Sequence, residues 1–180
     1  MHRIEFFHYS PAVIWGIRVD GTDLRSVVAE ATRALREREA DALADAEDAE
    51  DEEDEEDEEA TAQQRADFLA YRHGGMPQYE LGRPASYFLG EHDPAFRCGT
   101  PDGTPVLGCS CGVWECGPLL ARITVAEDTV TWSRFRDPYR PEWGDLPIGP
   151  YVFPRPAYEH ALAHPLGLDR DPLDPPDAQI

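Results

Sequence analysis

The chain has 180 residues, of which 41% are hydrophobic, and this length and composition suit one domain with one core rather than two domains. Its formal net charge is −20, but residues 41–59 alone hold 14 of the 36 acidic residues and no arginine. The rest of the chain carries 22 acidic side chains against 16 arginines, which excludes a halophilic surface and assigns the acidity to one segment.

Arginine supplies all 16 basic side chains, and the chain contains neither lysine nor asparagine. Because lysine and asparagine codons are AT-rich, this composition indicates a GC-rich genome and predicts a bacterial protein. The first residues lack the apolar run of a signal peptide, and no later stretch has the roughly eighteen apolar residues that a membrane helix requires. We therefore expect a cytoplasmic protein with no membrane association.

Two short strands are predicted at residues 3–9 and 12–19, separated by Ser10-Pro11. Asp20-Gly21 has the composition of a tight turn. A helix should follow it, because apolar residues recur at the 3.6-residue spacing of one buried stripe. Its stripe consists of Leu24, Val27, Val28, Ala31 and Leu35.

The helical stripe is lost from about Glu37, and residues 50–59 are ten consecutive carboxylates. Such a block repels itself and buries nothing, so residues 41–59 are predicted to form an acidic, low-complexity, disordered insertion. Helical spacing resumes at residues 62–72. One long helix through the tract is the alternative, because alanine and glutamate favour helix intrinsically.

The second half is predicted to begin with a glycine-, proline- and aromatic-rich segment, residues 76–102, that has little regular structure. Glu127-Asp128 is predicted to be the hairpin turn between two strands in which apolar and polar residues alternate. Pro154 or Pro156 can begin a short helix. Residues 166–180 are predicted to be a loosely ordered tail. The strands expected in this half are residues 105–108, 119–126, 129–135 and, as an edge strand, 151–153.

These elements predict an α+β fold, with an antiparallel sheet and helices on one face. Residues 1–40 and 60–165 should form this single domain.

Three of the four cysteines, Cys109, Cys111 and Cys116, lie within eight residues, and Cys98 precedes them by eleven. A closed zinc site needs four tetrahedral ligands, which Cys98 or a histidine such as His73 could complete. The one-residue spacer between the first two cysteines differs from the two-residue spacer of zinc knuckles, and no second pair is present.

Two other interpretations of this cysteine turn stay open. The cysteines can act as small apolar residues at a strand-turn-strand junction, with Gly108, Gly112 and Gly117 supplying backbone freedom. A redox role would require a thiol whose pKa is lowered by a nearby cation or helix N-terminus. The neighbouring Glu115 carboxylate would instead raise the pKa of a thiol.

The sequence contains no phosphate-binding glycine loop, no nucleophile elbow, no dinucleotide fingerprint and no paired histidines at helical spacing, so no catalytic or cofactor-binding residue is predicted. Residues 132–143 interleave arginines with aromatic side chains. Local ion pairs explain this pattern better than nucleic-acid binding, because the domain remains net acidic. The acidic tract is either a solvated insertion or, as the functional alternative, an attractant for a basic partner or a mimic of nucleic acid.

Residues 106–112 (Val-Leu-Gly-Cys-Ser-Cys-Gly), Cys116 and the hairpin at residues 120–132 resemble a family of uncharacterised bacterial proteins with a Gly-Cys-x-Cys-Gly turn before a β-hairpin. The segment 19–24 also resembles that family's strand-to-helix junction. The resemblance implies one compact domain and no catalytic function. We therefore expect a cytoplasmic bacterial binding or interaction domain, and the alternative is a small zinc-dependent or thiol-based enzyme centred on the cysteine turn.

Overall fold

The computed structural model describes residues 1–9, 13–47, 73–91, 103–113 and 116–174, and every structural statement concerns these residues. The N-terminal strands β1 (Ile4–Tyr9) and β2 (Ile14–Val19) pair antiparallel along their whole length, with Ile4 opposite Val19 and Tyr9 opposite Ile14. Both strands lie within the ranges predicted for them, and Trp15, Ile17 and Val19 of β2 are buried.

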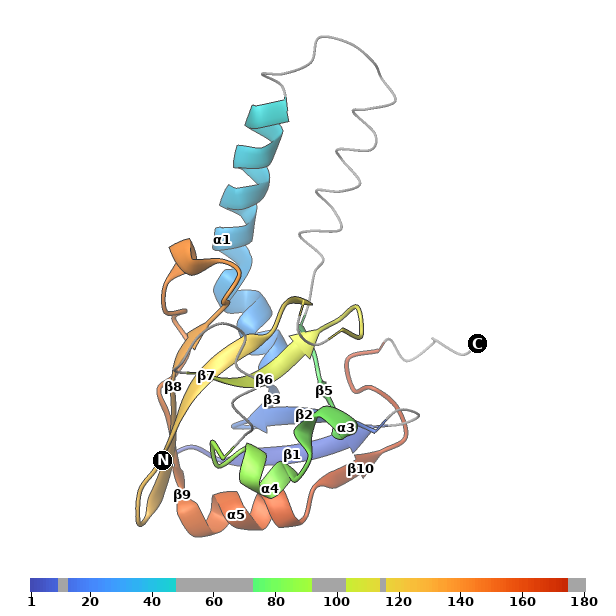
Figure 1. Ribbon diagram of the computed structural model, residues 1–180, viewed down its shortest axis with the longest axis vertical. Coiled ribbons are helices and arrows are strands. Elements are labelled where there is room, and N and C mark those ends of the chain that lie inside the picture. The colour runs from blue at the N-terminus through green and yellow to red at the C-terminus, as the bar shows by residue number, and fades with distance from the viewer. Residues whose placement is uncertain (10–12, 48–72, 92–102, 114–115, 175–180) are drawn as a thin grey trace.

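Asp20 and Gly21 connect β2 to the short strand β3 (Thr22–Asp23), with φ angles of 50° and 83°. Positive φ at both residues of a two-residue loop is the geometry that matches the right-handed twist of paired strands. The helix α1 (Leu24–Glu47) begins directly after β3, as its apolar spacing predicts. Its first half packs beside β2 and β3, and its last turns extend away from both sheets (Figure 1).

The loss of the apolar stripe at Glu37 does not end α1, which continues to Glu47 and so includes the start of the acidic tract. Alanine and glutamate have high helix propensity, which sustains the helix where packing no longer does. The remainder of the tract and the helix expected at residues 62–72 lie outside the described residues.

A second sheet has the order β4-β6-β7-β8-β9. The three central strands β6 (Thr104–Cys109), β7 (Leu119–Val125) and β8 (Thr129–Arg136) form an antiparallel meander. The Ala126 N–H donates to the Thr129 oxygen at 2.8 Å, which closes the predicted hairpin turn. The outer strands are β4 (His73–Gly74), beside β6, and the predicted edge strand β9 (Tyr151–Pro154), beside β8.

Two connections join the sheets into one curled sheet. On one side, β4 pairs with β6 and the adjacent strand β5 (Met76–Pro77) pairs with β2. On the other side, the His2 N–H donates to the Val152 oxygen at 2.7 Å, which links the segment before β1 to β9. The two short helices α3 (Gln78–Leu81) and α4 (Pro84–Tyr87) follow β5, in a segment where we expected little regular structure.

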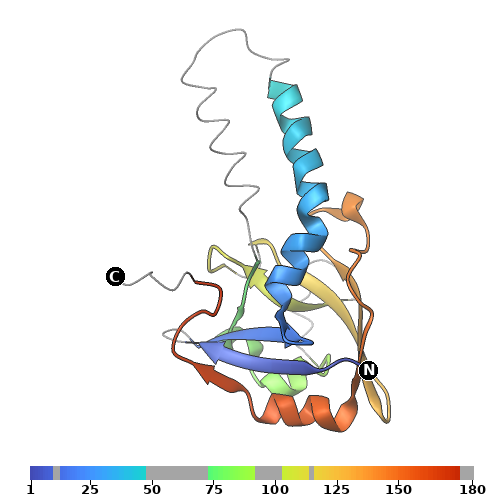
Figure 2. The same ribbon diagram turned by 180° about the vertical axis from the view of Figure 1, so that it is seen from behind.

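The C-terminal helix α5 (Arg155–Ala163) packs on β1, β8 and β9, at the end of the molecule opposite the last turns of α1 (Figure 2). The strand β10 (Leu166–Leu168) then adds to the free edge of β1 in parallel orientation. We expected a loosely ordered tail from residue 166, and the structure differs because backbone pairing with β1 holds these residues whatever their side chains.

Aromatic side chains from four segments that are distant in sequence meet at the centre of the core. The ring of Phe6 lies 4.9 Å from that of Phe88 and 5.6 Å from that of Tyr158, between ring centroids. Trp132 stacks on Phe88 at 6.3 Å. The Tyr158 hydroxyl accepts a hydrogen bond from Trp132 Nε1 at 3.1 Å and donates one to the Phe88 backbone oxygen at 2.5 Å. The Tyr158 hydroxyl is therefore buried with both a donor and an acceptor partner.

The predicted fold class is confirmed: one domain of mixed helices and strands with a curled antiparallel sheet. Among the described residues, none of the helices combines the length and the hydrophobicity that crossing a bilayer demands.

Replacing Tyr158 by phenylalanine should lower the free energy of unfolding by about 1–3 kcal/mol, because the Trp132 indole N–H and the Phe88 carbonyl lose a buried partner. Urea unfolding followed by tryptophan fluorescence measures this change. Tyr79→Phe is the matched control, since Tyr79 is 74% exposed, and it should change the free energy by less than about 0.5 kcal/mol. Equal stabilities of the two variants would contradict the importance of this hydroxyl.

Candidate metal centre and adjoining pocket

The cysteine turn connects β6 to β7. Cys109 is the last residue of β6, and Cys116 lies three residues before β7. These strands pair antiparallel, with Leu107 opposite Leu119, so the two ends of the turn must meet. The Gly112 N–H donates to the Cys109 oxygen at 3.3 Å, and Gly112 has a φ of +88°, a conformation that glycine adopts without strain. Strand pairing and this glycine together bring the three cysteines to one place.

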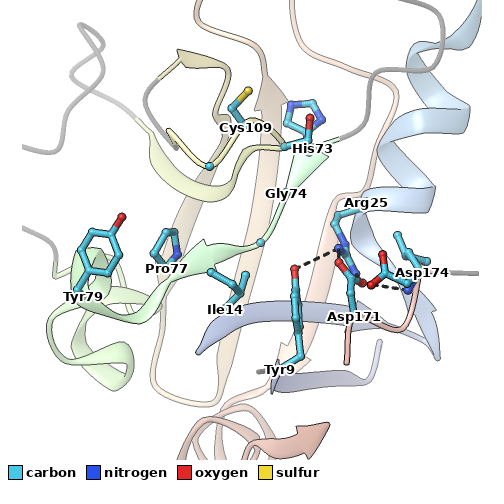
Figure 3. Close-up of a pocket in the computed structure, with 14 residues that line it drawn as sticks. Tyr9, Ile14, Arg25, His73, Gly74, Pro77, Tyr79, Cys109, Asp171 and Asp174 are labelled. Carbon is cyan, nitrogen blue, oxygen red and sulfur yellow. Dashed lines mark hydrogen bonds and ion pairs between the residues drawn. The ribbon is translucent and has the colours of Figure 1, made fainter. Parts of the chain in front are cut away.

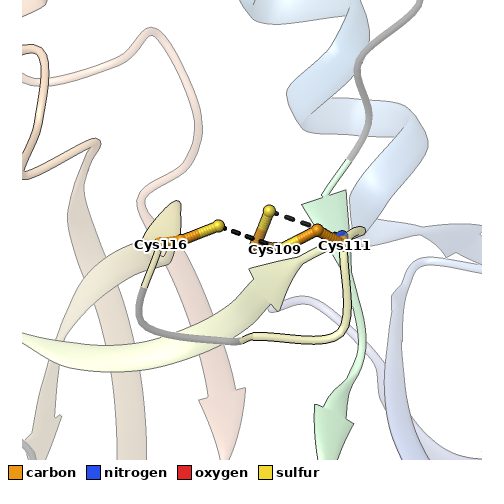
Figure 4. Close-up of side chains that lie close together, drawn as sticks. All are labelled: Cys109, Cys111 and Cys116. Atoms are coloured by element: carbon orange, nitrogen blue, oxygen red, sulfur yellow. Dashed lines mark hydrogen bonds between the residues drawn. The ribbon is translucent and has the colours of Figure 1, made fainter.

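The three thiols form one compact cluster (Figure 4). The Cys111 and Cys116 sulfurs are 3.0 Å apart, and the Cys111 N–H donates to Cys109 Sγ at 3.4 Å. All three sulfurs lie within 4.8 Å of one another. Cys109 is buried, whereas Cys111 and Cys116 are exposed, and all three are free thiols. Three cysteines are thus close enough to hold a metal ion.

The cluster disfavours a free thiolate. Hydrogen bonds with the Cys109 and Cys111 thiols raise the pKa of Cys116 to about 12, and the proximity of these groups adds to the effect. A second negative charge among sulfurs at this distance is costly unless a cation is present. The arrangement therefore suits thiols that share a cation better than a lone nucleophile.

The predicted fourth ligand, Cys98, lies outside the described residues. His73, the other candidate in the described chain, pairs with Cys109 in the β4–β6 register. Its nitrogens are not part of the group of potential ligand atoms within 4.8 Å, which comprises the three cysteines among the described residues. Burial, together with Arg36 and Arg140, lowers the pKa of His73 to about 4, so the imidazole is neutral at pH 7.

A pocket of about 450 Å³ adjoins the cluster, and Cys109 contributes to its wall (Figure 3). Five segments that are distant in sequence meet there. Sequence reasoning did not predict the pocket, because each segment contributes only a few residues and no common motif. The lining residues are Tyr9, Ile14, Arg25, His73, Gly74, Gly75, Pro77, Tyr79, Cys109, Ser110, Gly112, Asp171, Leu173 and Asp174.

Arg25 is the central charged group of the pocket, and it is only 3% exposed. Its Nε and Nη2 donate to the two oxygens of Asp23 at 3.0 and 2.8 Å. On its other edge, Nη1 and Nη2 donate to the two oxygens of Asp171 at 2.7 and 2.8 Å. Each carboxylate therefore makes a bidentate pair, the strongest geometry available to a guanidinium.

Tyr9 completes this network. Its hydroxyl accepts a hydrogen bond from Arg25 Nη1 at 3.3 Å, and the Arg25 guanidinium lies over its ring at 5.6 Å from the centroid. Burial raises the pKa of Tyr9 to about 12, with Arg25 opposing and Asp171 adding to the shift. The phenol is thus protonated at neutral pH and can donate a hydrogen bond to Asp171.

In segment 132–143, Arg134 and Arg140 form ion pairs with nearby carboxylates, as the ion-pair interpretation predicts. Trp132 and Phe135 are fully buried. Arg140 Nε donates to Glu39 at 3.0 Å, its Nη1 to Asp137 at 3.2 Å, and its guanidinium stacks on Trp143 in the 3₁₀ helix Pro141–Trp143. This segment fastens α1 to the loop after β8.

Comparison with protein-family models, with curated proteins and with solved structures finds no match to the chain. The resemblance to bacterial proteins with a Gly-Cys-x-Cys-Gly turn stays a prediction.

The Arg25–Asp171 pair predicts a pH dependence of stability. Partial burial raises the pKa of Asp171, but hydrogen bonds from Arg25 and from the Leu173 N–H outweigh burial and lower it below its ordinary value of 3.8. Asp171→Asn should therefore cost about 1–3 kcal/mol of unfolding free energy at pH 7, a magnitude typical of hydrogen bonds to charged groups.

The unfolded chain takes up the Asp171 proton at a higher pH than the folded chain does, because the folded pKa is the lower one. The stability difference between wild type and Asp171→Asn should be complete above the unfolded pKa of about 4, and it should shrink as pH falls through the folded value. Urea unfolding from pH 7 to pH 3 measures it. Asp174→Asn, on the same segment, should show no pH-dependent difference in stability from wild type. A difference between wild type and Asp171→Asn that stays constant from pH 7 to pH 3 would contradict the prediction.

Proposed function

We propose that this chain is a cytoplasmic bacterial binding domain whose cysteine turn holds one zinc ion through Cys109, Cys111 and Cys116. The observation that carries the proposal is that the three sulfurs lie within 4.8 Å of one another without a disulfide between them. Sulfurs bound to one tetrahedral zinc are about 2.3 Å from the metal and hence about 3.8 Å apart. The turn needs only small side-chain rotations to reach that spacing.

The donor set supports a soft metal ion such as zinc. Three thiolates and no carboxylate form a soft site, which favours zinc, copper(I) or an iron–sulfur cluster over magnesium or calcium. In a reducing cytoplasm, clustered cysteines serve more often as metal ligands than as structural disulfides. A divalent cation would also remove the cost of placing several thiolates together.

The position of the cluster supports a structural role for the ion. Cys109 ends one strand and Cys116 precedes its antiparallel neighbour, so an ion between them would cross-link the two strands beyond their last backbone pair. Cys111 and Cys116 are exposed, as is Val113 between them, at 58%. A cross-linked exposed turn is a rigid surface that a protein partner can recognise, since rigidity lowers the entropy lost on binding.

The fourth ligand separates the two candidate functions. A fourth thiolate from Cys98 would close the coordination shell, as in structural zinc sites, whereas three thiolates with an open position would fit a zinc enzyme. A thiol-based enzyme is favoured by the 3.0 Å contact between Cys111 and Cys116 but disfavoured by the raised pKa of Cys116.

Titration of the metal-free full chain with cobalt(II), followed by displacement with zinc, tests this proposal. We expect about one ion per chain with sulfur-to-metal charge-transfer absorption. Cys111→Ser and Cys116→Ser should each weaken zinc binding at least about tenfold, because each removes one sulfur atom that binds the ion directly. Ser110→Ala, in the same turn, is the matched control and should bind as the wild type does.

Cys98→Ser distinguishes the closed site from the open one. A closed site predicts weaker binding and a change in the cobalt spectrum, and an open site predicts no change. Absence of charge-transfer absorption in the reduced wild type, or equal zinc affinity of wild type and Cys116→Ser, would overturn the zinc proposal itself.

A further inference from the structure

We propose that the pocket is a binding site for a carboxylate that is attached to an apolar or aromatic body, and that Asp171 of the chain's own C-terminal segment occupies the carboxylate position in this structure. This site is separate from the proposed zinc site, although Cys109 lies in the wall between them.

The recognition groups are preorganised without Asp171. Asp23 holds the Nε edge of Arg25 through two hydrogen bonds, and Tyr9 receives a third from Nη1. The other edge of the Arg25 guanidinium faces Asp171. Nη1 donates to Asp171 Oδ2 at 2.7 Å, and Nη2 donates to Oδ1 at 2.8 Å. A guanidinium fixed on one edge offers its other edge as a planar fork for any carboxylate.

Charge balance allows Asp171 to leave. Arg25 remains paired with buried Asp23 when Asp171 withdraws, so no uncompensated charge stays inside the protein. An incoming carboxylate restores the arrangement of one guanidinium between two carboxylates.

The segment that carries Asp171 forms a local turn. The Leu173 N–H donates to Asp171 Oδ1 at 2.9 Å, and the Asp174 N–H donates to the Asp171 oxygen at 3.2 Å. These bonds orient the Asp171 carboxylate within its own segment, which follows the pairing of β10 with β1. Asp169, Arg170 and Asp174 are exposed. The segment thus presents a carboxylate to Arg25 in the manner of a bound peptide.

The pocket has room for more than a carboxylate. Its volume of about 450 Å³ falls within the range of small-molecule sites. Ile14, Pro77 and Tyr79 lie on the side of the pocket away from Arg25 and Asp171 (Figure 3). Tyr79 lines the pocket and is 74% exposed, so its ring is accessible to a ligand. These residues suit an apolar or aromatic body next to the carboxylate.

Isothermal titration of the full chain with 3-phenylpropionate tests the proposal, and 3-phenylpropanamide is the neutral analogue. Asp171→Ala removes the internal competitor. If Asp171 occupies the fork at least about 90% of the time, this variant should bind the acid at least about tenfold more tightly than wild type does. The amide should bind weakly to both, because it cannot accept two charged hydrogen bonds.

Two further variants control for general effects. Asp169→Ala removes an exposed carboxylate from the same segment at a residue that does not line the pocket, so its affinity for 3-phenylpropionate should stay within about twofold of wild type at 0.15 M salt, where long-range repulsion is screened. Arg25→Lys combined with Asp171→Ala keeps the positive charge but removes the fork, and should lose at least about tenfold of the gained affinity.

The source of the carboxylate is distinguished with N-acetylphenylalanine, which represents the C-terminus of a peptide. Tighter binding of this probe than of 3-phenylpropionate assigns the site to a peptide terminus, and the reverse assigns it to a free acid. Each titration is repeated with EDTA, which removes metal ions. Binding of the probe to a metal at the cysteine turn would then be lost, whereas binding to Arg25 would persist. Failure of the zinc proposal would therefore leave this test unaffected.

Equal affinities of wild type and Asp171→Ala for 3-phenylpropionate would overturn the proposal. So would equal binding of the acid and the amide, or retention of the affinity in the lysine variant.

Discussion

The close packing of residues 73–77 between the two sheets is the constraint on which both candidate sites depend. This short segment pairs first with β6 and then with β2, so it closes one side of the curled sheet. Only glycine fits at its centre: a Cβ on Gly75 would lie 2.4 Å from the Trp15 oxygen, and one on Gly74 would lie 2.8 Å from the Cys109 oxygen. The same approach places the end of β6, and hence the cysteine turn, beside the pocket that opens between Tyr9 and Tyr79.

Local sequence signals predicted most of the regular structure. The Asp20-Gly21 turn, the start of α1 and the hairpin between β7 and β8 are each encoded within a few residues, by turn composition or by apolar spacing. The strand β10 was missed because its pairing with β1 depends on where α5 ends, which is a property of the whole fold. The apolar stripe predicts the helix only to about Glu37, and its continuation to Glu47 agrees over these residues with the alternative of a helix that enters the tract, because helix propensity acts where the stripe is absent.

The two sites differ in how far the sequence could predict them. The cysteines are neighbours in sequence, so their meeting follows from one hairpin connection, and the turn was visible at once. The Arg25 fork joins residues that are 146 positions apart, and neither Arg25 nor Asp171 belongs to a recognisable motif. The one available signal was an arginine two residues after Asp23 at the start of a helix, which is common enough to carry no prediction. Such a pair depends on how the whole chain folds rather than on local sequence.

Cys109 connects the two sites physically. It is a buried residue of β6, its sulfur belongs to the thiol cluster, and its side chain forms part of the pocket wall together with Ser110 and Gly112. A group that ties the three sulfurs together also fixes the backbone of residues 109–112, and with it that wall. The opposite wall is held by the Arg25–Asp171 pair on the C-terminal segment. The pocket is thus bounded on one side by the cysteine turn and on the other by the Asp171 carboxylate. In the two proposals made above, metal would act on the pocket through the first wall and a competing carboxylate through the second.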